Sequence, residues 1–254
     1  MLQPIPAGKI YNFFIDDNVF FLHDIKKHGF KSIFENFYLN GLRKIHEEFG
    51  TCFTLNCFSR NWHDPAKFCI TEFPDTYRAE FEDNASWLRF AFHGDIEYPE
   101  RPYSTAYPEK LPEHYEFWHD NMVRIAGEKS IIAPVIFHFF DATDDCRRFM
   151  RKQGMKFMAQ RIGSGSGIVR DPAFDQYMIP VDIILNLFFA DLAGIRRTLE
   201  TAAASKEQIL IGSHEQYAYR GYENYIPEYF EQIRTACAVM AEQGFRCAYF
   251  NELV

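Results

Sequence analysis

The sequence contains no run of basic residues, and its formal net charge is −8, with 27 Lys and Arg against 35 Asp and Glu. Binding to nucleic acid or to an anionic membrane surface requires clustered positive charge, so neither is an expected partner. The N-terminal residues lack the basic segment and the apolar stretch of a signal peptide. The longest apolar stretch, IPVDIILNLFFADLAGI, is interrupted by Asp182, Asn186 and Asp191 and is a poor membrane span. We therefore expect a cytoplasmic protein.

The chain also lacks the local patterns of nucleotide and zinc sites. The segment GSGSG at 163–167 has neither GxGxxG spacing nor a following Lys. The six cysteines form no CxxC pair, and four of them lie inside expected strands or helices. Buried, reduced thiols are therefore expected, ahead of disulfides or zinc ligands. No low-complexity linker divides the 254 residues, so we expect a single domain over 1–254.

One local pattern that is present recurs along the chain. GLRKIHEEFG runs into TCFTLNCF, DATDDCRRFMRKQG into MKFMAQ, and YFEQIRTACAVMAEQG into FRCAYF. Each is an amphipathic helix, a Gly suited to a left-handed helix cap, and a short apolar strand. Such units build parallel sheets covered by helices, and the number of strands favours a barrel. The expected strands are 11–15, 51–58, 87–93, 131–140, 155–161, 179–187, 208–213 and 246–250.

Four of the apolar runs end on an acid or a histidine. KIYNFFI is followed by Asp16 and Asp17, WLRFAF by His93, IIAPVIF by His138, and QILIGS by His214. In parallel α/β barrels the carboxyl ends of the strands meet at one rim, so these side chains are expected to share one pocket. Aspartate and neutral imidazole suit a divalent metal ion, and a rim His suits proton transfer. Read singly, the two Asp residues fit a helix cap equally well.

The same segments resemble the motifs of polysaccharide deacetylases of the NodB-homology type, the carbohydrate esterase 4 group. FFIDD at 13–17, FAFHGDIE at 90–97 and ILIGSH at 209–214 are similar to its first, second and fifth motifs. VIFHFF at 135–140 stands in the place of the third motif, and PVDIIL, which contains Asp182, in that of the fourth. The resemblance covers nearly the whole chain and implies an irregular (β/α)₇ barrel.

The resemblance also implies roles for particular residues. Asp16 would be the catalytic base, Asp17 and His93 would bind the metal ion, His214 would be the catalytic acid, and Asp182 would orient it. The second motif of this group has two histidines, but the position four residues after His93 is Glu97. Either Glu97 or His138 would then complete the metal site, and we favour His138 because a strand end is rigid. The Arg-Pro pair of the third motif is absent from 135–140.

The activity implied is that of a metal-dependent hydrolase that removes an N-acetyl group from a carbohydrate or a related small molecule. The expected ion is zinc, with cobalt, nickel or iron as alternatives. Glu215 is a second candidate for orienting His214. The alternative function is a catalytically inactive barrel that binds a carbohydrate or another ligand. The side chains expected to contact the substrate are Glu97, Glu215, Tyr217 and Trp62.

Overall fold

The structure is a computed structural model, and it describes residues 2–162 and 167–254. The GSGSG segment therefore lies outside the described residues, except for Gly167. The strands are β1 (Ile10–Asn18), β2 (Phe53–Phe58), β3 (Leu88–Gly94), β4 (Phe157–Gln160), β5 (Val169–Asp171), β6 (Gln176–Pro180), β7 (Ile183–Ile184), β8 (Gln208–His214) and β9 (Arg246–Cys247). The helices are α1 (Phe20–His28), α2 (Phe37–Phe49), α3 (Arg78–Asp83), α4 (Leu111–Ala126), α5 (Asp144–Lys152), α6 (Leu192–Ala203) and α7 (Tyr229–Glu242).

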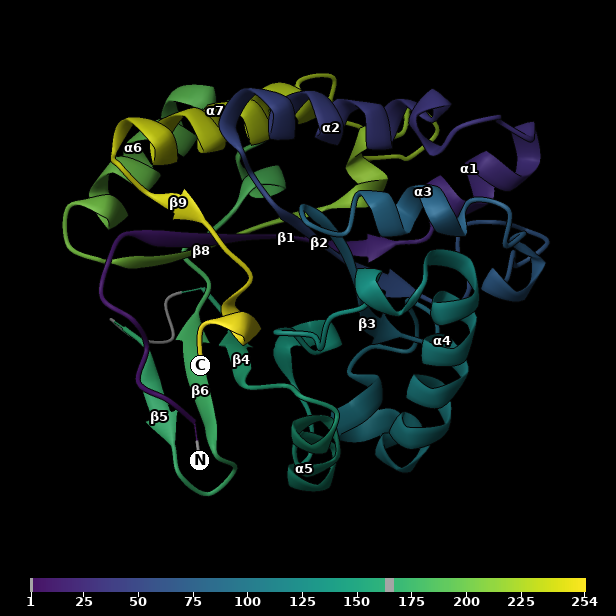
Figure 1. Cartoon of the computed structure of the whole chain (residues 1–254), viewed down its shortest axis with the longest axis horizontal. Helices are drawn as coiled ribbons and strands as arrows, with labels where there is room; N and C mark the ends of the chain where they lie inside the picture. The colour runs from purple at the N-terminus through teal and green to yellow at the C-terminus, as the bar shows by residue number, and fades with distance from the viewer. Residues whose placement is uncertain (1, 163–166) are drawn as a thin grey trace.

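Strand β1 is the centre of a parallel sheet with the order β3-β2-β1-β8-β7, and β9 also pairs with β1 (Figure 1). A second sheet has the order β4-β6-β5, in which β4 and β6 are parallel. The connections between the two sheets are also bonded to the larger sheet: Ile132 N–H donates to Phe90 O of β3 at 2.9 Å, and Asp182 N–H, between β6 and β7, donates to Leu210 O of β8 at 3.0 Å. The result is an irregular α/β barrel, as the sequence predicted.

The expected strand 131–140 is the largest error in the predicted elements. Residue 131 forms an isolated bridge to Phe90, and His138–Phe140 is a 3-10 turn. Pro134 supplies no N–H group to a ladder, and positive φ at Phe139 and Phe140 ends the extended backbone. The expected strand 179–187 is divided between the end of β6 and β7 and is followed by a 3-10 turn at Leu185–Phe188. The expected strand 246–250 is reduced to β9, and a 3-10 turn begins at Phe250.

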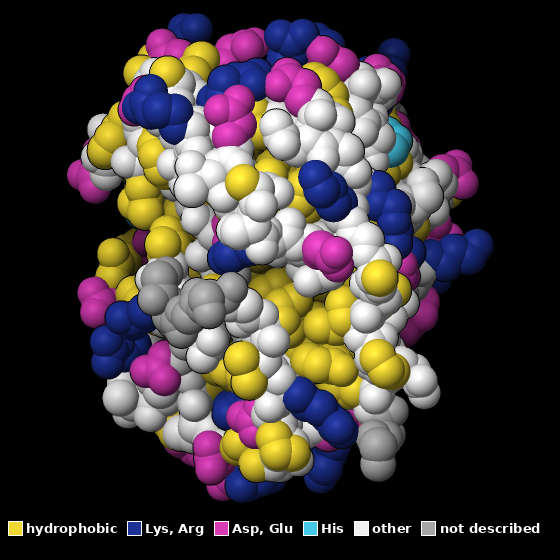
Figure 2. Space-filling model, turned by 90° about the vertical axis from the view of Figure 1, so that its left-hand side faces the viewer, with side chains coloured by type: hydrophobic (Ala, Val, Ile, Leu, Met, Phe, Trp, Pro, Cys, Tyr) yellow, Lys and Arg dark blue, Asp and Glu magenta, His cyan; other side chains and the backbone are white. Residues whose placement is uncertain are grey.

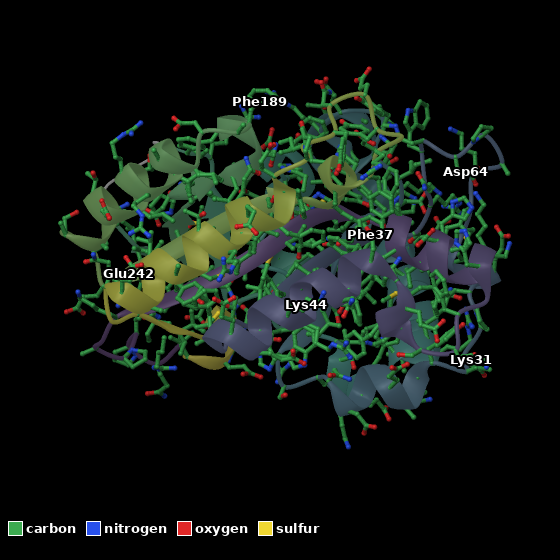
Figure 3. The ribbon with its side chains drawn as sticks, turned by 90° about the horizontal axis from the view of Figure 1, so that it is seen from above. Lys31, Phe37, Lys44, Asp64, Phe189 and Glu242 are labelled. Atoms are coloured by element: carbon green, nitrogen blue, oxygen red, sulfur yellow. The ribbon has the colours of Figure 1, made fainter. Side chains whose placement is uncertain are left out.

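The glycines that end the recurring helices have the predicted conformation. Gly50, Gly154 and Gly244 have φ of 67°, 94° and 76°, a region that glycine enters without steric cost. Figure 3 shows that α2 and α7 lie side by side over the sheet, with Phe37 at the start of α2 and Glu242 at the end of α7. After each of these two helices, the glycine ends the helix and the next strand returns the chain to the sheet.

The apolar strands are buried on both faces. In β1, Phe13 and Ile15 belong to the large core cluster beneath the helices, whereas Ile10 and Phe14 pack with the cluster that contains β4 and β8 residues. A continuous apolar run suits such a doubly covered strand. Figure 2, turned toward the left-hand side of Figure 1, shows acidic and basic side chains interspersed and hydrophobic side chains gathered in a hollow.

All six cysteines are free thiols; four are buried, and Cys69 and Cys247 are partly exposed. In the part of the chain that the structure describes, no helix combines the length and the apolar character that crossing a bilayer requires.

A close approach inside the barrel generates the first prediction. A Cβ atom added at Gly212 in β8 would lie 2.2 Å from Phe14 Cζ and 2.5 Å from Ile184 Cδ1. We expect Gly212→Ala to lower the free energy of unfolding by about 1–3 kcal/mol, because a packed interior resists added volume. Urea denaturation measures this change.

Gly221→Ala is the matched control, since no atom lies within 4 Å of its added Cβ. Its unfolding free energy should stay within about 0.5 kcal/mol of the parent value. Equal stabilities for the two variants would contradict the packing of β8 against β1.

Candidate metal centre

The polar side chains at the strand ends line one cavity of about 640 Å³. Asp16 is the register partner of His214 in the β1–β8 pair, and His93 lies near the end of β3. His138 comes from the 3-10 turn between β3 and β4, so it reaches the rim from a connection and not from a strand. The carboxyl ends of parallel strands thus bring Asp16, Asp17, His93 and His214 together, as predicted, whereas His138 joins them from a turn and not from the predicted strand.

Asp17, His93 and His138 form a buried group with ligand atoms that converge. The Nε2 atom of His93 lies 3.2 Å from Asp17 Oδ1 and 2.9 Å from His138 Nδ1, and the third side of the triangle is 3.9 Å. A point in its plane lies about 2.0 Å from all three atoms, within the range of about 2.0–2.2 Å that zinc prefers for nitrogen and oxygen ligands. Oδ1 of Asp17 and Nδ1 of His93 receive no hydrogen bond from the described residues. The donor set therefore fits a divalent ion.

The orientation of His138 is set by a backbone carbonyl. Its Nε2 lies 2.9 Å from Glu97 O, an atom that only accepts, so Nε2 carries the proton and Nδ1 presents a lone pair to His93 and Asp17. Burial and the neighbouring His93 lower the pKa of His138 to about 3. The Glu97 carboxylate instead contacts His63 Nε2 at 2.5 Å. The sequence left Glu97 and His138 open as the third metal ligand, and the converging group contains His138 and not Glu97.

The two adjacent carboxylates have opposite electrostatic environments. Burial raises the pKa of Asp16 despite the opposing charges of His93 and His214. Burial would also raise the pKa of Asp17, but the adjacent imidazoles hold it below its ordinary value. Asp17 also has a φ of 60°, which turns its side chain away from the regular β1 direction. One carboxylate is therefore suited to bind a cation and the other to take up a proton.

His214 is oriented by Asn186 and not by Asp182, which corrects the prediction. Nδ1 of His214 lies 2.9 Å from Asn186 Oδ1. Asp182 instead pairs with Lys206 at 2.5 Å and accepts the N–H of Leu210. The reason is its position: Asp182 precedes β7 and lies at the amino end of that strand, whereas Asn186 follows the carboxyl end.

Glu215 has a structural role instead of the predicted contact with substrate or with His214. Its side chain is fully buried and accepts the backbone N–H groups of Val19, Phe20 and Phe21 at 2.7–2.9 Å. These are donors at the amino end of α1 that no helical carbonyl satisfies. Burial raises the pKa of Glu215 to about 8, although these hydrogen bonds oppose the shift. The carboxyl group thereby ties the end of β8 to the start of α1.

The two predicted aromatic residues occupy different places. Tyr217 lines the cavity. Trp62 is 42% exposed and lies outside the lining, but its ring is 5.3 Å from that of Tyr98, which does line it. Phe139 and Phe140 also line the cavity and have φ of 63° and 56°, a strained conformation for bulky side chains that is often found at functional sites.

Three carboxamide residues were missed from the sequence. Asn186 contacts His214, Asn56 donates to Asp16 Oδ1 at 2.6 Å, and Gln216 donates to Asp17 Oδ2 at 2.7 Å. A signal existed for two of them, because Asn56 and Asn186 interrupt otherwise apolar runs, TCFTLNCF and IILNLFF. A buried amide needs partners, so an isolated Asn in an apolar run indicates a nearby polar group.

No protein-family model matches the chain, and no curated protein sequence is significantly similar to it. Solved structures do match, with high probability and low identity. Most are carbohydrate esterase 4 proteins of the NodB type, including polysaccharide and peptidoglycan deacetylases. The class defined by the fold is therefore the irregular (β/α)₇ barrel of polysaccharide deacetylases, as predicted.

Three neighbours illustrate the range. A family 4 acetyl xylan esterase from Clostridium thermocellum, in complex with a cobalt ion, is 10% identical with a TM-score of 0.52, over 96% of this chain and 90% of its own. A family 4 pseudoenzyme from Bacillus anthracis is 10% identical with a TM-score of 0.50, over 98% and 66%. A 4-alpha-glucanotransferase from Thermococcus litoralis is 12% identical with a TM-score of 0.61, over 98% and 40%. At these identities the likeness shows the fold alone.

The contacts of Glu215 generate the second prediction. In Glu215→Gln an NH₂ group replaces one of two oxygens that both accept backbone N–H groups, so donor faces donor. We expect the free energy of unfolding to fall by about 1–3 kcal/mol, the usual cost of leaving a buried donor without a partner.

Glu116→Gln, on the exposed face of α4, is the control and should change stability by less than about 0.5 kcal/mol. Denaturant unfolding of both variants decides the point. A Glu215→Gln protein as stable as the parent would show that the carboxyl group does not cap α1.

Proposed function

We propose that the protein is a metal-dependent hydrolase that removes an acyl group from the nitrogen of an acylated carbohydrate or a related small molecule. The observation that carries the proposal is the convergence of Asp17, His93 and His138 beside a second carboxylate, Asp16, and a third imidazole, His214. A cation site adjacent to one proton acceptor and one proton donor is one arrangement that catalyses amide hydrolysis.

Asp17, His93 and His138 would hold the ion, through Oδ1, Nε2 and Nδ1 respectively. A divalent cation supplies Lewis acidity when it is bound: it makes water more acidic and polarises a carbonyl group. Two imidazoles and one carboxylate suit zinc, and cobalt, nickel and iron are accepted by the same ligand types. The cobalt complex of the Clostridium thermocellum neighbour supports a divalent ion in this fold.

Asp16 and His214 would carry the proton transfers. Asn56 holds Oδ1 of Asp16, which leaves Oδ2 to take the proton of the attacking water. The raised pKa of Asp16 makes it a better base than an ordinary carboxylate. Asn186 holds Nδ1 of His214, so Nε2 delivers a proton to the departing amine nitrogen.

The substrate class rests on the neighbours and on the walls of the cavity. Structural neighbours deacetylate peptidoglycan N-acetylglucosamine or were solved with a substrate. Tyr98, Tyr217 and Tyr222 line this cavity, and aromatic rings commonly pack against sugar rings. An N-acetylated carbohydrate is accordingly the first substrate to test, and the expected location is the cytoplasm.

A second function, ligand binding without catalysis, is favoured by one specific observation. The position at which the second motif of polysaccharide deacetylases carries its second histidine is Glu97 here, and that carboxylate pairs with His63. The Bacillus anthracis neighbour is a pseudoenzyme with the same fold. The two functions differ in whether the cavity turns over an acylated ligand or only retains it.

Metal analysis generates the third prediction. Protein freed of metal with a chelator and then equilibrated with zinc or cobalt should retain about one equivalent of the ion, because Asp17, His93 and His138 offer three converging ligand atoms. His138→Ala should lose the ion, whereas Glu97→Gln should retain it, since the Glu97 carboxylate contacts His63. Elemental analysis of the two variants measures this. Retention by His138→Ala with loss in Glu97→Gln would reverse the ligand assignment.

Turnover generates the fourth prediction. Asp16→Asn keeps the shape and the contact with Asn56 but removes the basic oxygen, so hydrolysis of an N-acetylated sugar should fall at least about 100-fold. The metal content should equal that of the parent protein. Release of acetate and of free amine are the two readouts. A metal-loaded parent protein that binds acylated sugars without releasing acetate would establish the binding function instead.

A further inference from the structure

The Asp17 carboxylate has two oxygens in different surroundings. Oδ1 lies 3.2 Å from His93 Nε2 and 3.9 Å from His138 Nδ1 and receives no hydrogen bond from the described residues. Oδ2 accepts a hydrogen bond from Gln216 Nε2 at 2.7 Å. The orientation of the amide is unambiguous, because the reverse would place two acceptor oxygens against each other. The two oxygens are thus assigned to different partners.

The backbone of Gln216 is held independently of Asp17. The residue is 3% exposed and belongs to the 3-10 turn Glu215–Ala218 that follows β8. The preceding residue, Glu215, binds three backbone N–H groups at the start of α1, which fixes this turn against the chain that follows β1. The Gln216 amide therefore extends toward Asp17 from a fixed backbone, and its Oε1 receives no hydrogen bond from the described residues.

We propose that Gln216 is a positioning residue that restricts Asp17 to binding a cation through Oδ1 alone. A carboxylate free to rotate would offer both oxygens to an ion, or would turn toward the protonated nitrogen of a neighbouring imidazole. Hydrogen bonds to the outer atom of a ligand set its direction and its basicity. This inference rests on the proposed metal site and extends it to a residue that does not contact the ion.

Asn56 provides a matched comparison inside the same site. It is also a buried carboxamide, and it donates to the neighbouring carboxylate, Asp16 Oδ1, at 2.6 Å. Asp16 is not among the three converging ligands. If the two amides orient the two carboxylates separately, removal of the Gln216 amide should weaken binding of the ion. Removal of the Asn56 amide should leave it unchanged.

The fifth prediction compares Gln216→Met with Asn56→Leu, each of which replaces an amide with an apolar side chain of similar shape. Titration of metal-free protein with zinc against a chelating dye should give about 10–100-fold weaker binding for Gln216→Met. Asn56→Leu should bind zinc as tightly as the parent protein. The absorption spectrum of the cobalt-loaded protein, which reports ligand geometry, should change in Gln216→Met only.

Circular dichroism and urea unfolding establish that both variants are folded. If Gln216→Met does not fold, Gln216→Asn tests the same point, because its shorter side chain withdraws the donor while it stays polar. Unchanged zinc affinity and cobalt spectrum in a folded Gln216 variant, or equal losses in both variants, would overturn the inference. A parent protein that binds no ion would instead refute the proposed function, so the two failures are distinguishable.

Discussion

The parallel pairing of β1 with β8 positions the rest of the site. The register runs without a break from Ile10 opposite Gln208 to Asp16 opposite His214. This ladder brings the two residues proposed for proton transfer to the same level of the rim, although they are separated by almost 200 positions in the chain. The side chains of both strands are buried on both faces, so the register is held by packing as well as by hydrogen bonds.

The segments that follow β1 and β8 are also bonded to each other. After β1 the chain enters α1, and the buried carboxyl group of Glu215 binds the free N–H groups at the start of that helix. The next residue, Gln216, binds Asp17. The last residue of β8 and the first two residues of the turn after it therefore supply a proposed proton donor, a helix cap and a proposed carboxylate brace in three consecutive positions. Because these positions are adjacent, a substitution in this segment is expected to affect both the stability of the fold and the geometry of the site.

Neutral amides accompany the reactive groups throughout the site. Asn56, Gln216 and Asn186 contact Asp16, Asp17 and His214, respectively. An amide orients a carboxylate without neutralising it, which leaves the negative charge of Asp17 available for a cation. His138 reaches this group from a 3-10 turn, and the next two residues of that turn, Phe139 and Phe140, have positive φ. The third proposed metal ligand thus depends on a strained connection and not on a strand.

The sequence by itself determined the class of fold, because apolar runs without helical period and glycine-capped helices both report local backbone preference. It also determined which acids and histidines would meet, since the carboxyl ends of parallel strands share one rim. Only the tertiary structure decided that His138 and not Glu97 joins Asp17, and that Asn186 and not Asp182 holds His214. Asp182 and Asn186 are only four residues apart, but β7 lies between them, so that Asp182 is at the amino end of this strand and Asn186 follows its carboxyl end. Such choices depend on where each strand begins and ends, which is fixed by contacts between distant segments rather than by local sequence.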